Sequence, residues 1–86
     1  MMVEYPPGAS APPHRHPAVG LCYVLEGTAE SQYDGEEKRV FRTGDSYQDS
    51  ATKTHVYWRN PSATSPLRFI CAAQLAEGQE FAVPIR

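Results

Sequence analysis

Apolar and polar positions alternate in short runs along the chain, and turn-forming residues separate these runs at a spacing of roughly ten residues. Helical periodicity is nearly absent. Residue types that favour strands concentrate in the runs, so the pattern predicts strands over residues 3–5, 21–26, 28–33, 37–41, 46–49, 55–59 and 67–75. A series of short strands with regular turns is typical of an all-β barrel or sandwich.

Two short sequences mark the turns most clearly. Asp34-Gly35 stands between two predicted strands and predicts a two-residue hairpin. Thr43-Gly44-Asp45 predicts the following turn. No domain boundary or exact repeat interrupts the series, so we expect residues 1–86 to form one domain.

The charge pattern excludes some partners. The net charge is −2 and the eight Lys and Arg residues are scattered, so no basic stripe is present to bind nucleic acid. No apolar run is long enough for a membrane helix, and no signal-peptide pattern opens the chain. We therefore expect a soluble, cytoplasmic protein that binds neither nucleic acid nor membrane.

The three histidines carry the candidate chemistry. His14 and His16 are one residue apart, and in an extended segment both side chains point to the same face. Two imidazoles on one face can bind the same metal ion if the rest of the chain supplies further ligands. Three prolines restrict the backbone around this pair: Pro12, Pro13 and Pro17.

The spacing of glycines and histidines forms two motifs. The first reads Gly, five residues, His-x-His, three residues, Gly, six residues, Gly, and runs from Gly8 to Gly27. The second reads Gly, five residues, Ser-Ala-Thr, two residues, His, four residues, Asn, and runs from Gly44 to Asn60. In these motifs the chain resembles the cupin superfamily over about residues 5–75.

The resemblance implies an all-β jelly-roll barrel, also called a double-stranded β-helix, with one metal site. All three histidines, His14, His16 and His55, fall on the family's ligand positions. The sequence departs from the family at Gly20, which replaces the usual glutamate, and in the second motif, where Ser50 and Thr52 replace Pro and Gly and Asn60 comes one residue late.

Asp49 is the best substitute for the missing glutamate, as a ligand or as a partner of a water beside the ion. An ordinary aspartate at the end of a strand is the competing interpretation, and Gln48 and Gln32 are weaker candidates. Three imidazoles suit Fe, Zn, Ni, Mn or Cu, so the sequence predicts a divalent transition metal whose identity stays open. Three protein ligands leave coordination positions open for a substrate. The alternative is a vestigial site, in which the barrel is kept and the metal is lost.

Four residues are candidates for contact with a substrate. One of Tyr57 and Trp58 should face the barrel interior, and Cys22 and Gln48 lie on strands expected near the site. Cys22 and Cys71 are far apart in sequence and not in CxxC form, which favours two free buried thiols over a disulfide. The segment 21–26 is apolar on both faces, so we expect it to be covered on both sides.

These observations lead to a metal-binding cupin domain with a small-molecule substrate, and similarity in the ligand set to three-histidine dioxygenases makes an oxygenase-like reaction one option. The alternatives are a non-catalytic barrel that binds or senses a small ligand and a scaffold with an empty site. A barrel this small leaves strand edges uncovered, so we expect a homodimer to which residues 1–5 and 81–85 contribute.

Overall fold

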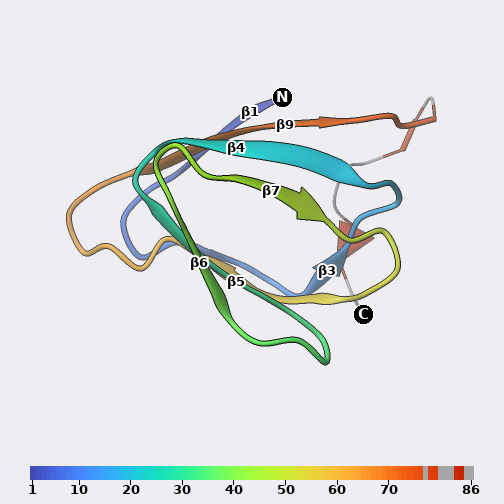
Figure 1. Cartoon of the computed structure of the whole chain (residues 1–86), viewed down its shortest axis with the longest axis horizontal. Helices are drawn as coiled ribbons and strands as arrows, with labels where there is room; N and C mark the ends of the chain where they lie inside the picture. The colour runs from blue at the N-terminus through green and yellow to red at the C-terminus, as the bar shows by residue number, and fades with distance from the viewer. Residues whose placement is uncertain (77, 80–82, 85–86) are drawn as a thin grey trace.

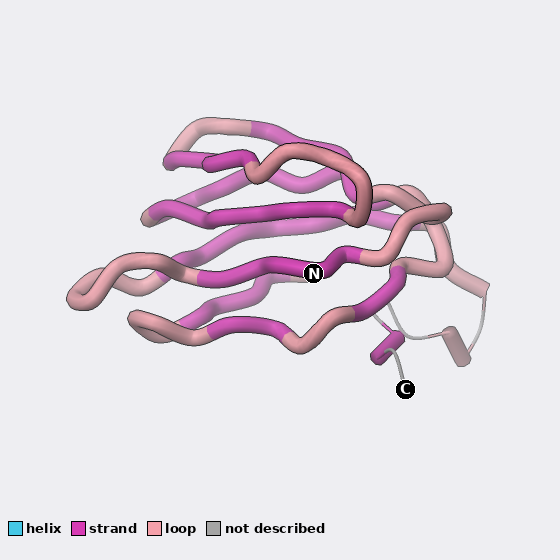
Figure 2. Tube along the Cα trace, turned by 90° about the horizontal axis from the view of Figure 1, so that it is seen from below, coloured by secondary structure: helices cyan, strands magenta, loops and turns pink. Residues whose placement is uncertain are grey.

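The computed structural model describes residues 1–76, 78–79 and 83–84, and these consist of strands joined by loops and turns (Figure 2). Two sheets face each other as layers (Figure 1). The strands are β1 (Met2–Tyr5), β2 (Ser10–Ala11), β3 (His14–Arg15), β4 (Gly20–Glu26), β5 (Thr28–Tyr33), β6 (Arg39–Arg42), β7 (Ser46–Asp49), β8 (His55–Arg59), β9 (Leu67–Ala73) and β10 (Val83–Pro84). The prediction of an all-β jelly-roll barrel is confirmed.

The order of strands shows the double-sheet topology. One sheet has four strands in the order β1-β9-β4-β7, and the other has the order β10-β3-β8-β5-β6 with β2 beside β8. All of the pairings are antiparallel. Consecutive strands often lie in different sheets, so segments far apart in sequence become neighbours. No helix that could cross a bilayer occurs in the part of the chain described.

The seven predicted strands correspond to β1 and to β4 through β9, with ends that shift by one or two residues. The strands β2, β3 and β10 were not predicted, because two residues are too few to leave a periodic pattern. Most of the segment 81–85, expected to contribute to a dimer, lies outside the described residues; only Val83 and Pro84 are described, paired with β3.

The hairpin at Asp34-Gly35 is longer than predicted. The ladder between β5 and β6 ends where Ser31 pairs with Arg39, so residues 34–38 connect the two strands. Gly35 supplies a positive φ of 79° inside a turn that the Glu36 N–H closes on the Tyr33 carbonyl (3.0 Å). On its other side, β5 stays paired with β8 as far as Tyr33, which is opposite His55.

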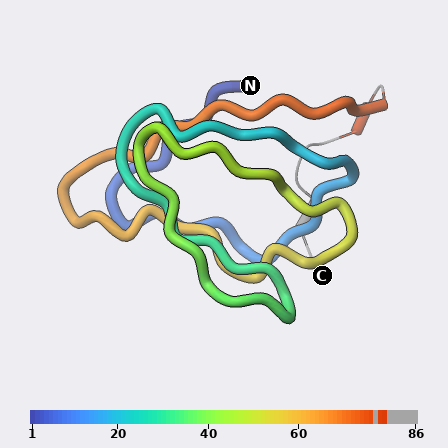
Figure 3. The backbone as a smooth tube through the Cα atoms, in the orientation of Figure 1, coloured from blue at the N-terminus to red at the C-terminus, as the bar shows by residue number. Residues whose placement is uncertain are grey.

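Alternation along β4 and β9 builds the core. Val24, Leu67 and Phe69 are buried between the sheets, while the alternate positions face outward. The expectation that the segment 21–26 is covered on both sides is wrong for this chain alone, since Leu21 is 64% exposed. The loop after β8 lies beside the loop after β1, where the Asn60 N–H donates to the Ala9 carbonyl (2.9 Å; Figure 3).

The prediction of two free thiols is also wrong, because Cys22 and Cys71 form a disulfide. They are separated by 49 residues in sequence, yet they stand directly opposite each other where β4 pairs with β9, with a Cα–Cα distance of 4.1 Å. The bond therefore follows from strand register, which sequence spacing does not reveal.

Candidate metal centre

The sheet topology brings the three histidines together. His14 lies on β3 and His55 at the start of β8, and the two are direct cross-strand partners. His16 follows β3 on the same face as His14, while Arg15 between them is exposed. The three side chains are buried, with 7%, 4% and 2% of the surface of His14, His16 and His55 exposed.

The imidazole rings surround a common point. Ring centroids are 4.8 Å apart for His14 and His16, 4.9 Å for His14 and His55, and 5.8 Å for His16 and His55. One nitrogen from each ring lies within 4.8 Å of the other two. Metal–nitrogen bonds are about 2.0–2.1 Å long, so small side-chain rotations would bring all three donors to one ion.

The hydrogen bonds of the rings suit metal binding. His14 Nδ1 lies 2.8 Å from the Pro12 carbonyl and donates to it, which leaves its Nε2 with a lone pair. His55 Nε2 is 2.8 Å from Ser31 Oγ. Among the described residues, the buried Nδ1 of His55 has no hydrogen-bond partner. A metal ion would satisfy this nitrogen, so the residues present fit such a group.

Burial keeps the imidazoles of His14 and His55 neutral. Desolvation lowers the pKa of His14, although the bond to the Pro12 carbonyl acts in the opposite direction. Desolvation, supported by the neighbouring imidazoles, lowers the pKa of His55 to about 3. A neutral ring has the lone pair that a metal ion requires, so His14 and His55 are ready to bind at neutral pH.

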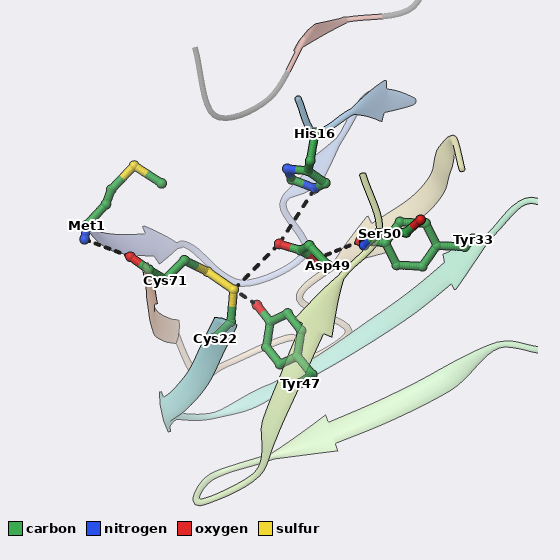
Figure 4. The surroundings of a disulfide bond; sticks show 8 residues. All are labelled: Met1, His16, Cys22, Tyr33, Tyr47, Asp49, Ser50 and Cys71. Atoms are coloured by element: carbon green, nitrogen blue, oxygen red, sulfur yellow. Dashed lines mark hydrogen bonds and ion pairs between the residues drawn. A yellow bond between two sulfur atoms is a disulfide. The ribbon is translucent and has the colours of Figure 1, made fainter. Parts of the chain in front are cut away.

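Asp49, on β7, lies beside the His16 ring of this cluster (Figure 4). Its Oδ2 is 3.7 Å from His16 Nε2, and its Oδ1 accepts a 2.7 Å hydrogen bond from the Tyr33 hydroxyl. The group of three metal-competent side chains to which Asp49 belongs consists of Cys22, Asp49 and Cys71 and contains no histidine. The structure therefore places Asp49 against one of the three predicted ligands.

Tyr33 and Ser31 are site residues that the sequence analysis missed. The Tyr33 ring stacks on His55 at 4.1 Å and 10°, and its hydroxyl also accepts a hydrogen bond from the Ser50 N–H (3.2 Å). Desolvation, followed by the bond to Asp49, raises the pKa of Tyr33, so the hydroxyl stays a donor. Alternation along β5 was the available signal, because it places Ser31 on the buried face.

The histidines line a cavity of about 370 Å³, and Asp49 lies at its wall. The other lining side chains are mostly apolar or aromatic: Met1, Val3, Tyr5, Tyr47, Trp58 and Phe69. Trp58 is thus the inward member of the Tyr57–Trp58 pair. Tyr57 instead donates to Glu30 (3.1 Å), and neither Gln48 nor Cys22 lines this cavity.

The fold and the site together define a class of protein. It is a small antiparallel barrel of two sheets, in which three imidazoles at the wall of an apolar cavity are suited to binding a metal ion. The chain belongs to the cupin domain family, whose model matches residues 1–73. This match confirms the family that the glycine and histidine motifs indicated.

Two curated fungal proteins are similar in sequence. The oryzines biosynthesis cluster protein J of Aspergillus oryzae is 38% identical over 83% of this chain and 38% of its own length. The cupin-domain-containing oxidoreductase srdB of Neurospora crassa is 32% identical over 80% of this chain and 34% of its own length. The chain therefore spans little more than a third of these relatives.

Solved structures show the same fold. The DMSP lyase DddQ from Ruegeria pomeroyi superposes with a TM-score of 0.77 over 96% of this chain and 40% of that protein, at 24% identity. A cupin protein from Bacteroides fragilis gives a TM-score of 0.69 over 92% of this chain and 66% of its own, at 25% identity.

Proposed function

We propose that this chain is a metal-binding cupin domain that acts on a small molecule, with His14, His16 and His55 as ligands of one divalent transition-metal ion. The observation that carries the proposal is the convergence of three buried imidazoles at one cavity. The ligand type suits Fe, Zn, Ni, Mn or Cu. When bound, such an ion supplies Lewis-acid or redox chemistry, and three protein ligands leave positions for a substrate.

The residues around the rings determine which nitrogen atom of His14 and of His55 faces the ion. We assign the His55 proton to Nε2, where Ser31 Oγ accepts it, so that the Nδ1 lone pair faces the ion. His14 is held in the complementary form by the Pro12 carbonyl. We further propose that Asp49, held by the Tyr33 hydroxyl, orients His16 or a water beside the ion.

The cavity limits the substrate to a small, largely apolar molecule. Its volume of about 370 Å³ is near the lower end of small-molecule sites. The described residues that line it include one acid and no Lys or Arg, so the lining offers an anionic group no Lys or Arg side chain. A neutral substrate, or one with a single oxygen anion that binds the metal, fits this lining best.

The relatives support an enzymatic role without naming the reaction. One curated relative is called an oxidoreductase, and one structural neighbour is a lyase. An oxygenase-like reaction is our leading proposal, and a non-catalytic barrel that binds or senses a small ligand is the alternative. We also propose that residues 1–86 form one cytoplasmic domain that assembles as a homodimer.

Element-resolved mass spectrometry of protein purified without added metal tests the proposal. We expect a single transition metal at near-stoichiometric level, and its loss in His55→Ala with the fold retained in circular dichroism. Val56→Ala is the matched control, because the neighbouring side chain is exposed and should leave the metal content unchanged. Equal metal content in wild type and His55→Ala would contradict the site, and metal-free protein that still binds a ligand would favour the alternative.

A further inference from the structure

A second cluster of metal-competent side chains lies outside the three-histidine group, on the inner face of the four-stranded sheet. It consists of Cys22, Asp49 and Cys71, which are all buried. One donor atom from each lies within 4.8 Å of the other two. Figure 4 shows the two sulfur atoms, the carboxylate and the His16 ring side by side.

Backbone register aims the two cysteines at each other. The N–H and the carbonyl of Cys71 both bond to Met1 at 2.9 Å, on the side of β9 away from β4. Cys22 and Cys71 therefore form a non-hydrogen-bonded pair of the β4–β9 ladder. Opposing side chains come closest at such pairs, so the two sulfur atoms would remain neighbours without the covalent bond.

Asp49 adds a buried carboxylate to the pair. Its Oδ2 lies 3.5 Å from Cys22 Sγ and 3.7 Å from His16 Nε2. In the described part of the chain, no Lys or Arg forms an ion pair with Asp49. A buried carboxylate is costly without a compensating charge, and a cation beside the sulfur atoms would provide one.

We infer that reduction of the disulfide converts this cluster into a second metal site, which binds a thiophilic divalent ion such as Zn²⁺ or Cd²⁺. A dithiol reductant breaks the S–S bond by transferring two electrons and two protons, so that two thiols form and the reductant becomes a cyclic disulfide. The incoming ion displaces both thiol protons and binds two thiolates and Asp49 Oδ2.

Soft sulfur ligands distinguish this site chemically from the imidazole site. On the inner face, Asp49 lines the cavity of about 370 Å³ together with Met1 and Tyr47, and this cavity provides a route to the cluster. Asp49 lies between the cysteines and His16, so the oxidation state of the cysteines acts on a carboxylate that adjoins the histidine site.

Cadmium binding by the full chain tests the inference. Protein reduced with a dithiol, and freed of it by anaerobic desalting, should bind one more Cd²⁺ ion than the oxidised protein, with a thiolate-to-cadmium absorption band in the ultraviolet. The double change Cys22→Ser, Cys71→Ser should remove both signals. The band reports sulfur ligands alone, so it should persist in His55→Ala even if the three-histidine proposal fails.

Two further samples keep the result interpretable. Asp49→Asn should weaken the additional binding at least tenfold, whereas Asp34→Asn, an exposed change in the hairpin turn, should not. Wild type that is reduced and alkylated replaces the double variant if the latter does not fold. The inference is overturned if reduction adds no cadmium, if the band is absent, or if reduction destroys the near-ultraviolet circular dichroism of the fold.

Discussion

Gly20 on β4 and Asp49 on β7 are direct cross-strand partners. Opposed residues of a sheet project their side chains to the same face, so the Asp49 carboxylate lies next to the space that a side chain at position 20 would enter. The cupin motif that this chain resembles has a glutamate at the position of Gly20. The geometry is consistent with a carboxylate that has moved from one strand to its neighbour.

Asp49→Asn should weaken metal binding at the histidine site by about 10–100-fold, which is the usual effect of losing a group that orients a ligand. The physical reason is that the amide keeps the shape of the side chain but loses the charge beside His16. Isothermal titration of metal-free protein measures the affinity. Asp34→Asn is the control on the exposed hairpin, and identical affinities for the two variants would exclude Asp49 from the site.

Tyr33→Phe should lower the free energy of unfolding by about 1–3 kcal/mol, because Asp49 Oδ1 is left without its donor in a buried position. The ring still stacks on His55, so the change isolates the hydroxyl. Urea denaturation measures the effect. Tyr57→Phe removes a comparable bond, to the partly exposed Glu30, and should cost less. Equal losses of unfolding free energy in the two variants would show that the Tyr33–Asp49 bond stabilises the fold no more than the Tyr57–Glu30 bond.

Short-range alternation predicted the main strands and the pairing of two histidines, because it gives each long strand its apolar side and places His14 and His16 on one face. His55 was added to this pair only by the resemblance to the cupin motifs, since it lies on a strand distant in sequence. Ser31 lies on the buried face of β5 by the same rule and could have been found. The Cys22–Cys71 bond and the Gly20–Asp49 pairing depend instead on register between strands distant in sequence, which one sequence does not encode locally.

Stability of the metal-free protein should fall as the pH is lowered from about 6.5 towards 3, partly because of His55. The unfolded chain binds a proton at this ring near its ordinary pKa of 6.5, whereas burial lowers the folded-state pKa to about 3. Protons in this window therefore favour unfolding, by about 1 kcal/mol per pH unit. Chelator-treated wild type and His55→Gln should differ in slope in urea melts over this range. Parallel curves would contradict the assignment.

Asn60→Ala should destabilise the fold by about 2–4 kcal/mol without altering the metal content of the protein that folds. Its side chain is fully buried, and its amide donates to the carbonyls of Tyr5 (3.2 Å), Pro6 (3.3 Å) and Ser65 (2.8 Å). The variant thus leaves three backbone acceptors without this donor. Thermal denaturation measures the loss, with the exposed Thr64→Ala as control. A midpoint equal to that of the control would disprove this structural role.

We expect the proposed homodimer to form through the outer face of the four-stranded sheet. Met2, Ile70 and Tyr23 form a row of exposed side chains across β1, β9 and β4, with Leu21 beside it. An apolar face of this kind is typically covered by a partner, and a second copy can cover it by two-fold packing of the same face.

Leu21→Arg should therefore convert the dimer into a monomer in light scattering at micromolar concentration, because two buried guanidinium groups would lie near each other across the two-fold axis. Val40→Arg is the control, since this valine is also exposed but lies on the other sheet, outside the proposed interface. A wild-type mass equal to one chain would refute the dimer. If both variants are monomeric, the added charge itself causes the dissociation, and the outer face of the four-stranded sheet is not the interface.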